Sequence, residues 1–155
     1  MGLGTQVRNI LTRAMEIQAF VQNETFLFPE ATNITCTLAA GGGNNTWGAW
    51  VQIQDSNALL FSTRFAARAG FLSECALSNF SVDLNRYMFE IGWGAVPTVV
   101  ARGMCISATA ATGPLPYFVD LRSGQIPAGE LIYYRMMCET GGATCIVGFR
   151  YYYVL

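Results

Sequence analysis

The side chains of this chain that could do chemistry are five cysteines and ten carboxylates. The sequence contains no histidine and no lysine, so all nine cationic side chains are arginines. A cysteine nucleophile needs a base that removes the thiol proton, and histidine is the usual base. Without lysine, Schiff-base chemistry and a phosphate-loop lysine are excluded as well. Most catalytic mechanisms near neutral pH are therefore closed to this chain.

The cysteines could also bind a metal, and the carboxylates could act as a catalytic pair. The cysteines form no Cys-x-x-Cys pair, and a zinc site would also lack histidine ligands. Two carboxylates can hydrolyse a glycosidic bond, but spacing alone does not show that two of the ten face each other across a cleft. A carboxylate hydrolase is the third hypothesis. We expect no catalytic residue, no metal and no cofactor, and we interpret the cysteines as buried free thiols.

Three tryptophans suggest binding rather than catalysis. Trp47 and Trp50 follow the glycine-rich segment 41–45, and Trp93 lies in the segment 89–94. Exposed indole rings can stack on sugars, whereas buried ones anchor a core or an interface. We favour the core or interface interpretation, with Trp47 as the residue most suited to contact a carbohydrate.

The C-terminal segment carries the clearest strand pattern. Two apolar runs, 131–139 and 145–154, flank a short turn at 140–144. Because glycine tolerates the positive φ of a tight turn, the simplest prediction is a hairpin closed at Gly141-Gly142. Its register pairs residues whose numbers sum to 283. Alternation along both strands then predicts one core face. That face consists of Ile132, Tyr134, Met136, Cys138, Cys145, Val147, Phe149 and Tyr151.

The opposite face of this hairpin is too apolar for simple exposure to solvent. Tyr133 would lie across from Arg150, and Met137 across from Ile146. Tyrosine, methionine and arginine are enriched in buried protein–protein contacts. The face could be covered by another subunit, by the same chain or by a ligand, and we favour another subunit. The predicted contact residues are Tyr133, Arg135, Met137, Ile146, Arg150 and Tyr152.

The N-terminal segment 6–21 carries a convincing helical pattern. Its apolar residues recur at spacings of three and four and form one stripe. The stripe includes Val7, Ile10, Leu11 and Ala14. Such a helix either packs on its own domain or docks on a neighbouring subunit, and both alternatives stay open. In the second case these four residues belong to a subunit interface.

After residue 22 the sequence changes to short runs of β-branched and aromatic residues separated by turn residues. The predicted strands are 24–28, 34–40, 49–54, 58–63, 74–82, 87–92, 99–109, 117–121, 131–139 and 145–154. This spacing favours an antiparallel β-sandwich or jelly roll. We therefore predict an all-β fold with an N-terminal helical arm at 1–22 and a β-sandwich domain at 23–155.

The surface chemistry is unusual for a soluble monomer. Charged residues make up 12% of the 155 residues, about half the usual ~25%, and the net charge is −1. We expect no nucleic-acid partner, because phosphate contacts need a concentrated positive surface. No membrane insertion is expected either, since apolar runs fall short of the ~20 residues of a spanning helix. Large apolar patches usually mark association surfaces, so the composition favours an assembly component.

Two segments carry a family resemblance: FEIGWG at 89–94 and IPAGELIYYRMMCETGGATCIVGFRYYY at 126–153. In these segments the chain resembles small β-rich structural proteins of tailed bacteriophages, which include capsid decoration (cement) proteins and tail or baseplate accessories. The resemblance implies a sandwich or jelly-roll domain, frequent trimers and no catalytic residues. Its implied location is the virion, after synthesis in the host cytoplasm.

We therefore expect a non-enzymatic virion protein that stabilises a phage particle by bridging neighbouring subunits. Its partners would be the major capsid protein or other virion subunits and further copies of the chain, with a trimer favoured. The alternative is a tail or baseplate accessory, a fibre-like module that recognises host-surface carbohydrate through Trp47 and its glycine-rich loop.

Overall fold

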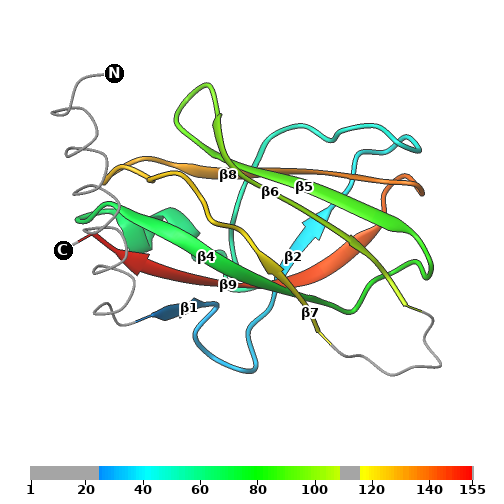
Figure 1. The fold of residues 1–155 in the computed structure, drawn as a ribbon, viewed down its shortest axis with the longest axis horizontal. Helices are drawn as coiled ribbons and strands as arrows, with labels where there is room; N and C mark the ends of the chain where they lie inside the picture. The colour runs from blue at the N-terminus through cyan, green and yellow to red at the C-terminus, as the bar shows by residue number, and fades with distance from the viewer. Residues whose placement is uncertain (1–24, 109–115, 155) are drawn as a thin grey trace, which may run out of the picture.

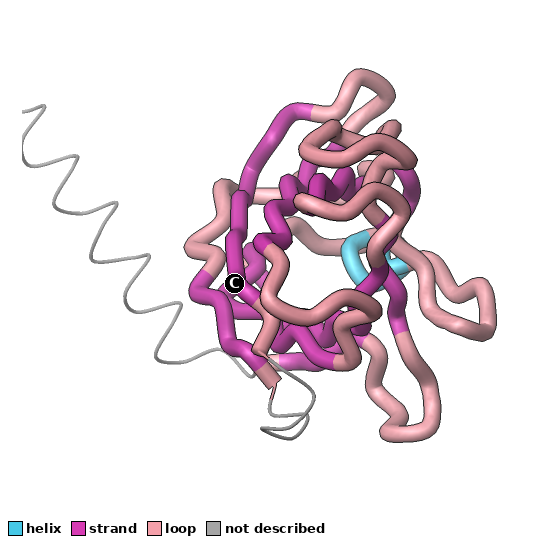
Figure 2. The backbone as a smooth tube through the Cα atoms, turned by 90° about the vertical axis from the view of Figure 1, so that its right-hand side faces the viewer, coloured by secondary structure: helices cyan, strands magenta, loops and turns pink. Residues whose placement is uncertain are grey.

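The computed structural model describes residues 25–108 and 116–154. In this part of the chain the regular structure is nearly all β (Figure 1). The strands are β1 (Phe26–Phe28), β2 (Cys36–Ala39), β3 (Val51–Gln52), β4 (Gly70–Ser78), β5 (Arg86–Trp93), β6 (Thr98–Ile106), β7 (Tyr117–Asp120), β8 (Ile132–Cys138) and β9 (Thr144–Tyr153). A short 3-10 helix, η1 (Phe61–Phe65), lies beside the strands (Figure 2). The predicted arm with Val7, Ile10, Leu11 and Ala14 lies outside the described residues.

The strands form two antiparallel sheets that pack together as a sandwich. In sheet A, β1 and β2 both pair with one side of β9, which is followed by β4 and β7. In sheet B the order is β3-β8-β5-β6. The buried side chains of both sheets point into the space between them and form one core. The all-β sandwich predicted from strand spacing is therefore confirmed.

The predicted hairpin between the last two strands is wrong in its pairing. β8 lies in sheet B between β3 and β5, whereas β9 lies in sheet A between β2 and β4. The glycine-rich loop after β2 explains the separation, because it binds the connection between the two strands. Gly142 donates its N–H to the carbonyl of Gly41, and Gly141 donates to Asn44 Oδ1, both at 2.8 Å. A side chain at Gly141 would collide with the Gly42 carbonyl, so this backbone contact requires glycine.

The core face predicted for these strands is nevertheless correct. All eight residues named for it are buried, four from β8 and four from β9. They face one another across the interior of the sandwich instead of side by side in one sheet. Alternation therefore identified the buried face and missed the partner strand.

The strand predicted at 58–63 is also wrong, since a turn and η1 occupy this segment. Asp55 Oδ1 accepts the N–H groups of Asn57 and Leu59, both at 2.9 Å. A side chain that satisfies nearby backbone donors in this way competes with strand pairing. Ala58 adopts a left-handed conformation with φ of 61°. The turn delivers Phe61 into the core instead of into a sheet.

All five cysteines are free and buried in the core. Burial raises the pKa of the Cys36 thiol to about 12 and that of Cys105 to about 11, and it raises those of Cys75 and Cys145 further. Because the thiolate is the reactive species, we expect a disulfide reagent at pH 8 to leave the native protein unlabelled. The same reagent in denaturant should label five thiols per chain. Rapid labelling of the native protein would contradict the burial of these side chains.

Candidate functional site

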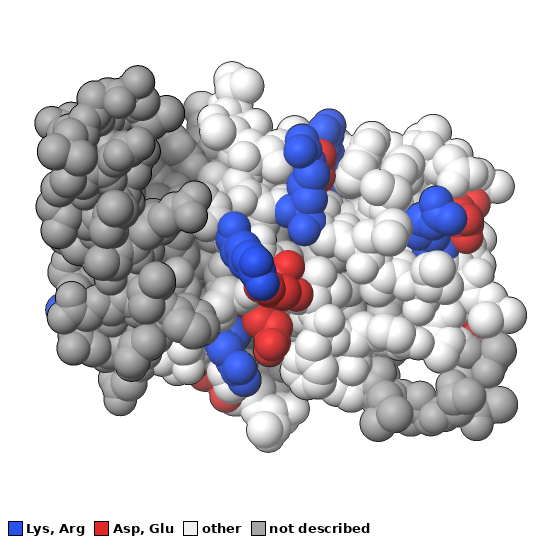
Figure 3. Space-filling view, in the orientation of Figure 1, with Lys and Arg blue, Asp and Glu red and all other residues white. Residues whose placement is uncertain are grey.

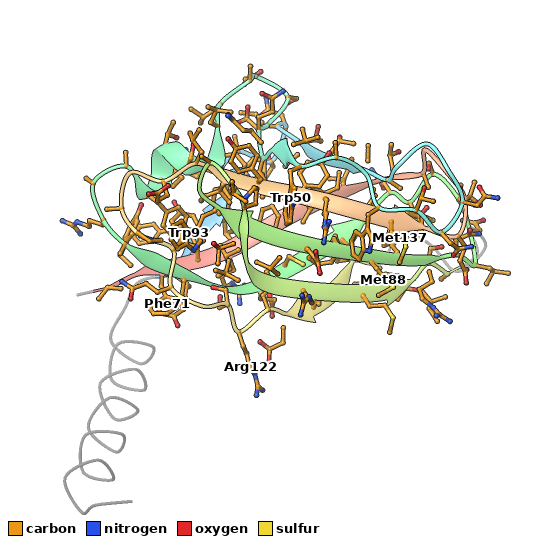
Figure 4. The ribbon with its side chains drawn as sticks, turned by 90° about the horizontal axis from the view of Figure 1, so that it is seen from above. Trp50, Phe71, Met88, Trp93, Arg122 and Met137 are labelled. Carbon is orange, nitrogen blue, oxygen red and sulfur yellow. The ribbon has the colours of Figure 1, made fainter. Side chains whose placement is uncertain are left out.

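The outer face of sheet B carries a row of methionines. β5 lies between β8 and β6, and the register pairs Met88 with Met137 on one side and with Met104 on the other. Because side chains of directly opposed residues share a face, the three methionines form one row across three strands. Figure 4 shows Met88 and Met137 along this face of the sheet. Met137 and Met88 are half-buried, and Met104 is 54% exposed.

A row of charges lies two residues further along the same strands. Glu90 of β5 is opposed by Arg135 of β8 and by Arg102 of β6. The Nε atoms of Arg102 and Arg135 each donate to a different carboxylate oxygen of Glu90, both at 2.7 Å. The side chain of Glu90 is only 7% exposed, whereas that of Arg102 is 72% exposed. One covered carboxylate thus binds two arginines, and the row has a net charge of +1.

These two arginines determine the ionisation of Glu90. Burial raises the pKa of its carboxyl, but the hydrogen bonds and charges of Arg102 and Arg135 outweigh burial and hold the pKa below its usual value. Glu90 is therefore ionised at neutral pH. In this state it fixes the planes of both guanidinium groups.

The glycine-rich loop brings two tryptophans to the same face. The loop is tied to β8 by hydrogen bonds from the N–H groups of Gly48 to the Met136 carbonyl and of Asn45 to the Cys138 carbonyl. As a result, the guanidinium carbon of Arg135 lies 5.0 Å from the ring centroid of Trp47 and 4.9 Å from that of Trp50. This is the geometry of a cation–π contact. Both tryptophan residues are half-buried.

The structure separates the predicted contact residues into two groups on opposite faces of the sandwich. Tyr133, Arg135 and Met137 lie on the outer face of sheet B, where Gln52 Nε2 donates to the Tyr133 hydroxyl at 3.5 Å. Ile146, Arg150 and Tyr152 lie on the outer face of sheet A. The predicted pairs of Tyr133 with Arg150 and of Met137 with Ile146 are therefore wrong. Both errors follow from placing β8 and β9 in one hairpin.

The outer face of sheet A has a different character. Arg150 Nη1 lies 3.6 Å from Glu74 Oε1, and Tyr152 stacks on Phe71 with ring centroids 5.3 Å apart. Glu74 is also opposite Asp120 in the register of β4 and β7, so two carboxylates are neighbours. Asp120 binds Arg122 at 2.7 Å. Each carboxylate thus has its own arginine, as expected of structural ion pairs.

Four residues of the sheet B face were missed in the sequence: Met88, Glu90, Arg102 and Met104. Alternation within 86–93 would have placed Met88 and Glu90 on the face opposite Tyr87, Phe89 and Ile91, which are buried. The sequence contains no signal that brings β5 between β6 and β8. Only the order of the strands in sheet B shows that the three methionines form one row and the three charged residues form another.

Charged side chains are sparse on the molecule. In Figure 3 they form small clusters in which both signs lie together, and most of the visible surface outside the grey atoms is uncharged. Within residues 25–108 and 116–154, no group of three or more Cys, Asp or Glu side chains could hold a metal ion. The same residues contain no helix long and apolar enough to cross a membrane.

Comparisons with known proteins give no family for this chain. No model of a known protein family matches the sequence, and no curated protein sequence matches it significantly.

Proposed function

We propose that this protein is a non-enzymatic structural subunit of a virus particle, which it stabilises by bridging neighbouring subunits through the outer face of sheet B. The observation that supports this proposal is the combination of side chains on that face. It joins the methionine row to Trp47 and Trp50, and Arg135 is in cation–π contact with both rings. The virion location rests on the resemblance of segments 89–94 and 126–153 to phage structural proteins.

The residue types on this face suit a contact that excludes water. Methionine adapts its shape to a partner surface, and aromatic residues and arginine supply most of the energy of well-packed contacts. Glu90 and the two indole rings already hold Arg135 in place, so little conformational entropy is lost when a partner covers it. Many symmetry-related copies in a shell make individually modest contacts effective. The proposed partners are the major capsid protein and further copies of this chain, as a trimer.

Replacing Met137 with glutamate tests this face. The substitution puts a charge into the methionine row and is expected to lower the amount of protein on purified particles at least about tenfold, because a central contact residue contributes ~2 kcal/mol or more. The measurement is the copy number per particle, by quantitative mass spectrometry. Ile146→Glu is the matched control, since Ile146 is a half-buried outer residue of β9 in sheet A.

The outcomes separate the two parts of the proposal. Particles that contain no wild-type protein would contradict the virion role. Equal incorporation of Met137→Glu and Ile146→Glu would contradict the choice of face. Thermal unfolding of both purified variants shows whether the fold is retained.

A tail or baseplate module that binds host carbohydrate is the second candidate. It is favoured by Trp47, a half-buried residue in the loop that follows the glycine-rich segment. Arg135 lies over this ring, so a sugar would have to use the remaining surface. A glycan array with the wild-type protein and Trp47→Ala distinguishes the candidates. Binding that Trp47→Ala abolishes would support the tail module, whereas a purely bridging protein binds no glycan.

A further inference from the structure

Strand β6 is an edge strand of sheet B and pairs with β5 alone among the described strands. Immediately after β6, Ser107 donates its N–H to the carbonyl of Asn85 on the β5 side. The register between the strands is regular over residues 101–106. In an antiparallel pair, alternate residues direct their backbone groups to the same neighbour. The backbone N–H and C=O groups of the odd-numbered residues 101–107 therefore point toward β5. Those of residues 102, 104 and 106 point away from it.

The two halves of this edge differ. At the start of β6, Gly124 donates its N–H to the Val100 carbonyl at 2.9 Å and covers the strand. For Arg102, Met104 and Ile106, the structure contains no hydrogen bond from another described residue to the outward backbone groups. Edge strands are commonly protected by proline, by a bulge or by a covering segment. Residues 102–106 contain no proline, and the register shift in this pair lies at the other end. Within residues 25–108 and 116–154 nothing pairs with this half of the edge, and we call it the open edge.

The side chains along the open edge have a defined chemistry. Arg102 ends the charge row, in which positive, negative and positive side chains follow one another from β8 to β5 to β6. Continuing this alternation by one strand places a carboxylate opposite Arg102. Met104 and Ile106, each 54% exposed, follow on the same face and favour apolar neighbours.

We propose that the open edge of β6, residues 102–106, binds an extended strand of another protein that carries a carboxylate opposite Arg102 and an apolar side chain opposite Met104. The backbone of the added strand pairs with β6 and supplies the affinity, while the two side chains supply the specificity. This inference concerns the edge of the sheet and does not depend on a virion role. A second copy of β6 fits less well, because residues 98–106 contain no acidic side chain to meet Arg102.

The test uses the isotope-labelled full chain and two synthetic peptides. The first is acetyl-Thr-Val-Thr-Val-Thr-Glu-Thr-amide, which in antiparallel register places Glu opposite Arg102 and Val opposite Met104 and Ile106. The second has Gln in place of Glu. We expect the Glu peptide to slow amide exchange at residues 102, 104 and 106 and to bind about two- to fivefold more tightly than the Gln peptide, as suits an exposed ion pair.

Three protein variants assign the effect. Arg102→Gln should bind both peptides equally. Arg122→Gln is the matched control, because Arg122 is also exposed and ion-paired at 2.7 Å but points away from both sheets (Figure 4), so it should keep the preference for Glu. Met104→Pro removes an outward N–H at a position where an edge strand tolerates proline, and it should abolish binding. Its fold is checked by thermal unfolding.

Four results would overturn the proposal. Slow amide exchange at residues 102, 104 and 106 in the free monomer would show that the edge is already paired. Equal binding of both peptides to the wild-type chain would remove the role of Arg102, and undiminished binding by Met104→Pro would remove backbone pairing. Self-association that Met104→Pro abolishes, seen by sedimentation velocity, would replace the acidic partner with a second copy. Particle occupancy is not part of this test, so its result stands apart from the proposed function.

Discussion

Replacing Phe61 with alanine is expected to lower the free energy of unfolding by about 3–5 kcal/mol, the usual cost of deleting a buried phenylalanine ring. Phe61 has no exposed surface. Its ring centroid lies 4.6 to 5.5 Å from those of four other aromatic rings, namely Phe28, Phe65, Phe149 and Tyr151. The cavity would open between η1, β1 and β9, where neighbouring rings cannot close it without leaving their own contacts. Urea unfolding followed by tryptophan fluorescence measures the loss.

Phe118→Ala is the control for this prediction. Phe118 is 64% exposed on β7, so its truncation should change the free energy of unfolding by less than about 0.5 kcal/mol. A loss below about 1 kcal/mol for Phe61→Ala would mean that the aromatic cluster is loosely packed. Similar losses for the two variants would mean that the loss at Phe61 does not come from the burial of its ring.

Phe61 also shows where sequence reasoning fails for this fold. The segment 58–63 is apolar and short, as a strand would be, and its composition alone favours β structure. The deciding residue lies outside the segment: Asp55 accepts the N–H groups of Asn57 and Leu59 and closes a turn that extends into the start of the run. An aspartate near an apolar run is too common to predict such a turn. The other nine predicted strands overlap β1 to β9, the strands found in residues 25–108 and 116–154.

The last two strands show what the alternation of side chains along a strand can predict and what it cannot. A period of two separates the inner face from the outer face, and all eight predicted core residues of β8 and β9 are buried. It carries no information on which strand lies alongside, because pairing depends on contacts distant in sequence. The connection at 140–143 is held by the loop at 41–44, about one hundred residues away. The two-glycine turn looked like a local hairpin only because this loop could not be foreseen.

For the candidate site too, the sequence predicted which face of a strand is exposed but not which strands lie beside it. Tyr133, Arg135 and Met137 could be assigned to an outward face from the sequence, and the structure places them together on sheet B. Their grouping with Ile146, Arg150 and Tyr152 is wrong for the reason just given. Glu90 is a charged residue with apolar neighbours on both sides in β5. Its two arginine partners come from strands on either side and could be found only from the sheet order.

Replacing Glu90 with glutamine is expected to lower the free energy of unfolding at pH 7 by about 1.5–3 kcal/mol, the usual contribution of hydrogen bonds to a charged group. Glutamine retains one acceptor oxygen, but its amide N–H groups would face a guanidinium. The loss should stay below the 3–5 kcal/mol of a fully buried pair, because both arginines are partly exposed and regain water. Asp120→Asn is the control: its ion pair with Arg122 is exposed at both ends and should contribute ~1 kcal/mol or less.

The pH dependence of stability gives this prediction a second and more specific readout. The pKa of Glu90 is lower in the folded protein than its ordinary value of ~4.3. Its contribution is therefore fully present above about pH 4.3 and is lost as the pH falls through the folded-state pKa, since the unfolded chain then binds more protons than the native one. Urea unfolding from pH 7 to pH 3 should show a steeper acid loss for the wild type than for Glu90→Gln. Parallel curves would mean that the two arginines do not stabilise the carboxylate. In that case Glu90 would not hold Arg135 in a fixed position, and the proposed contact depends on that position.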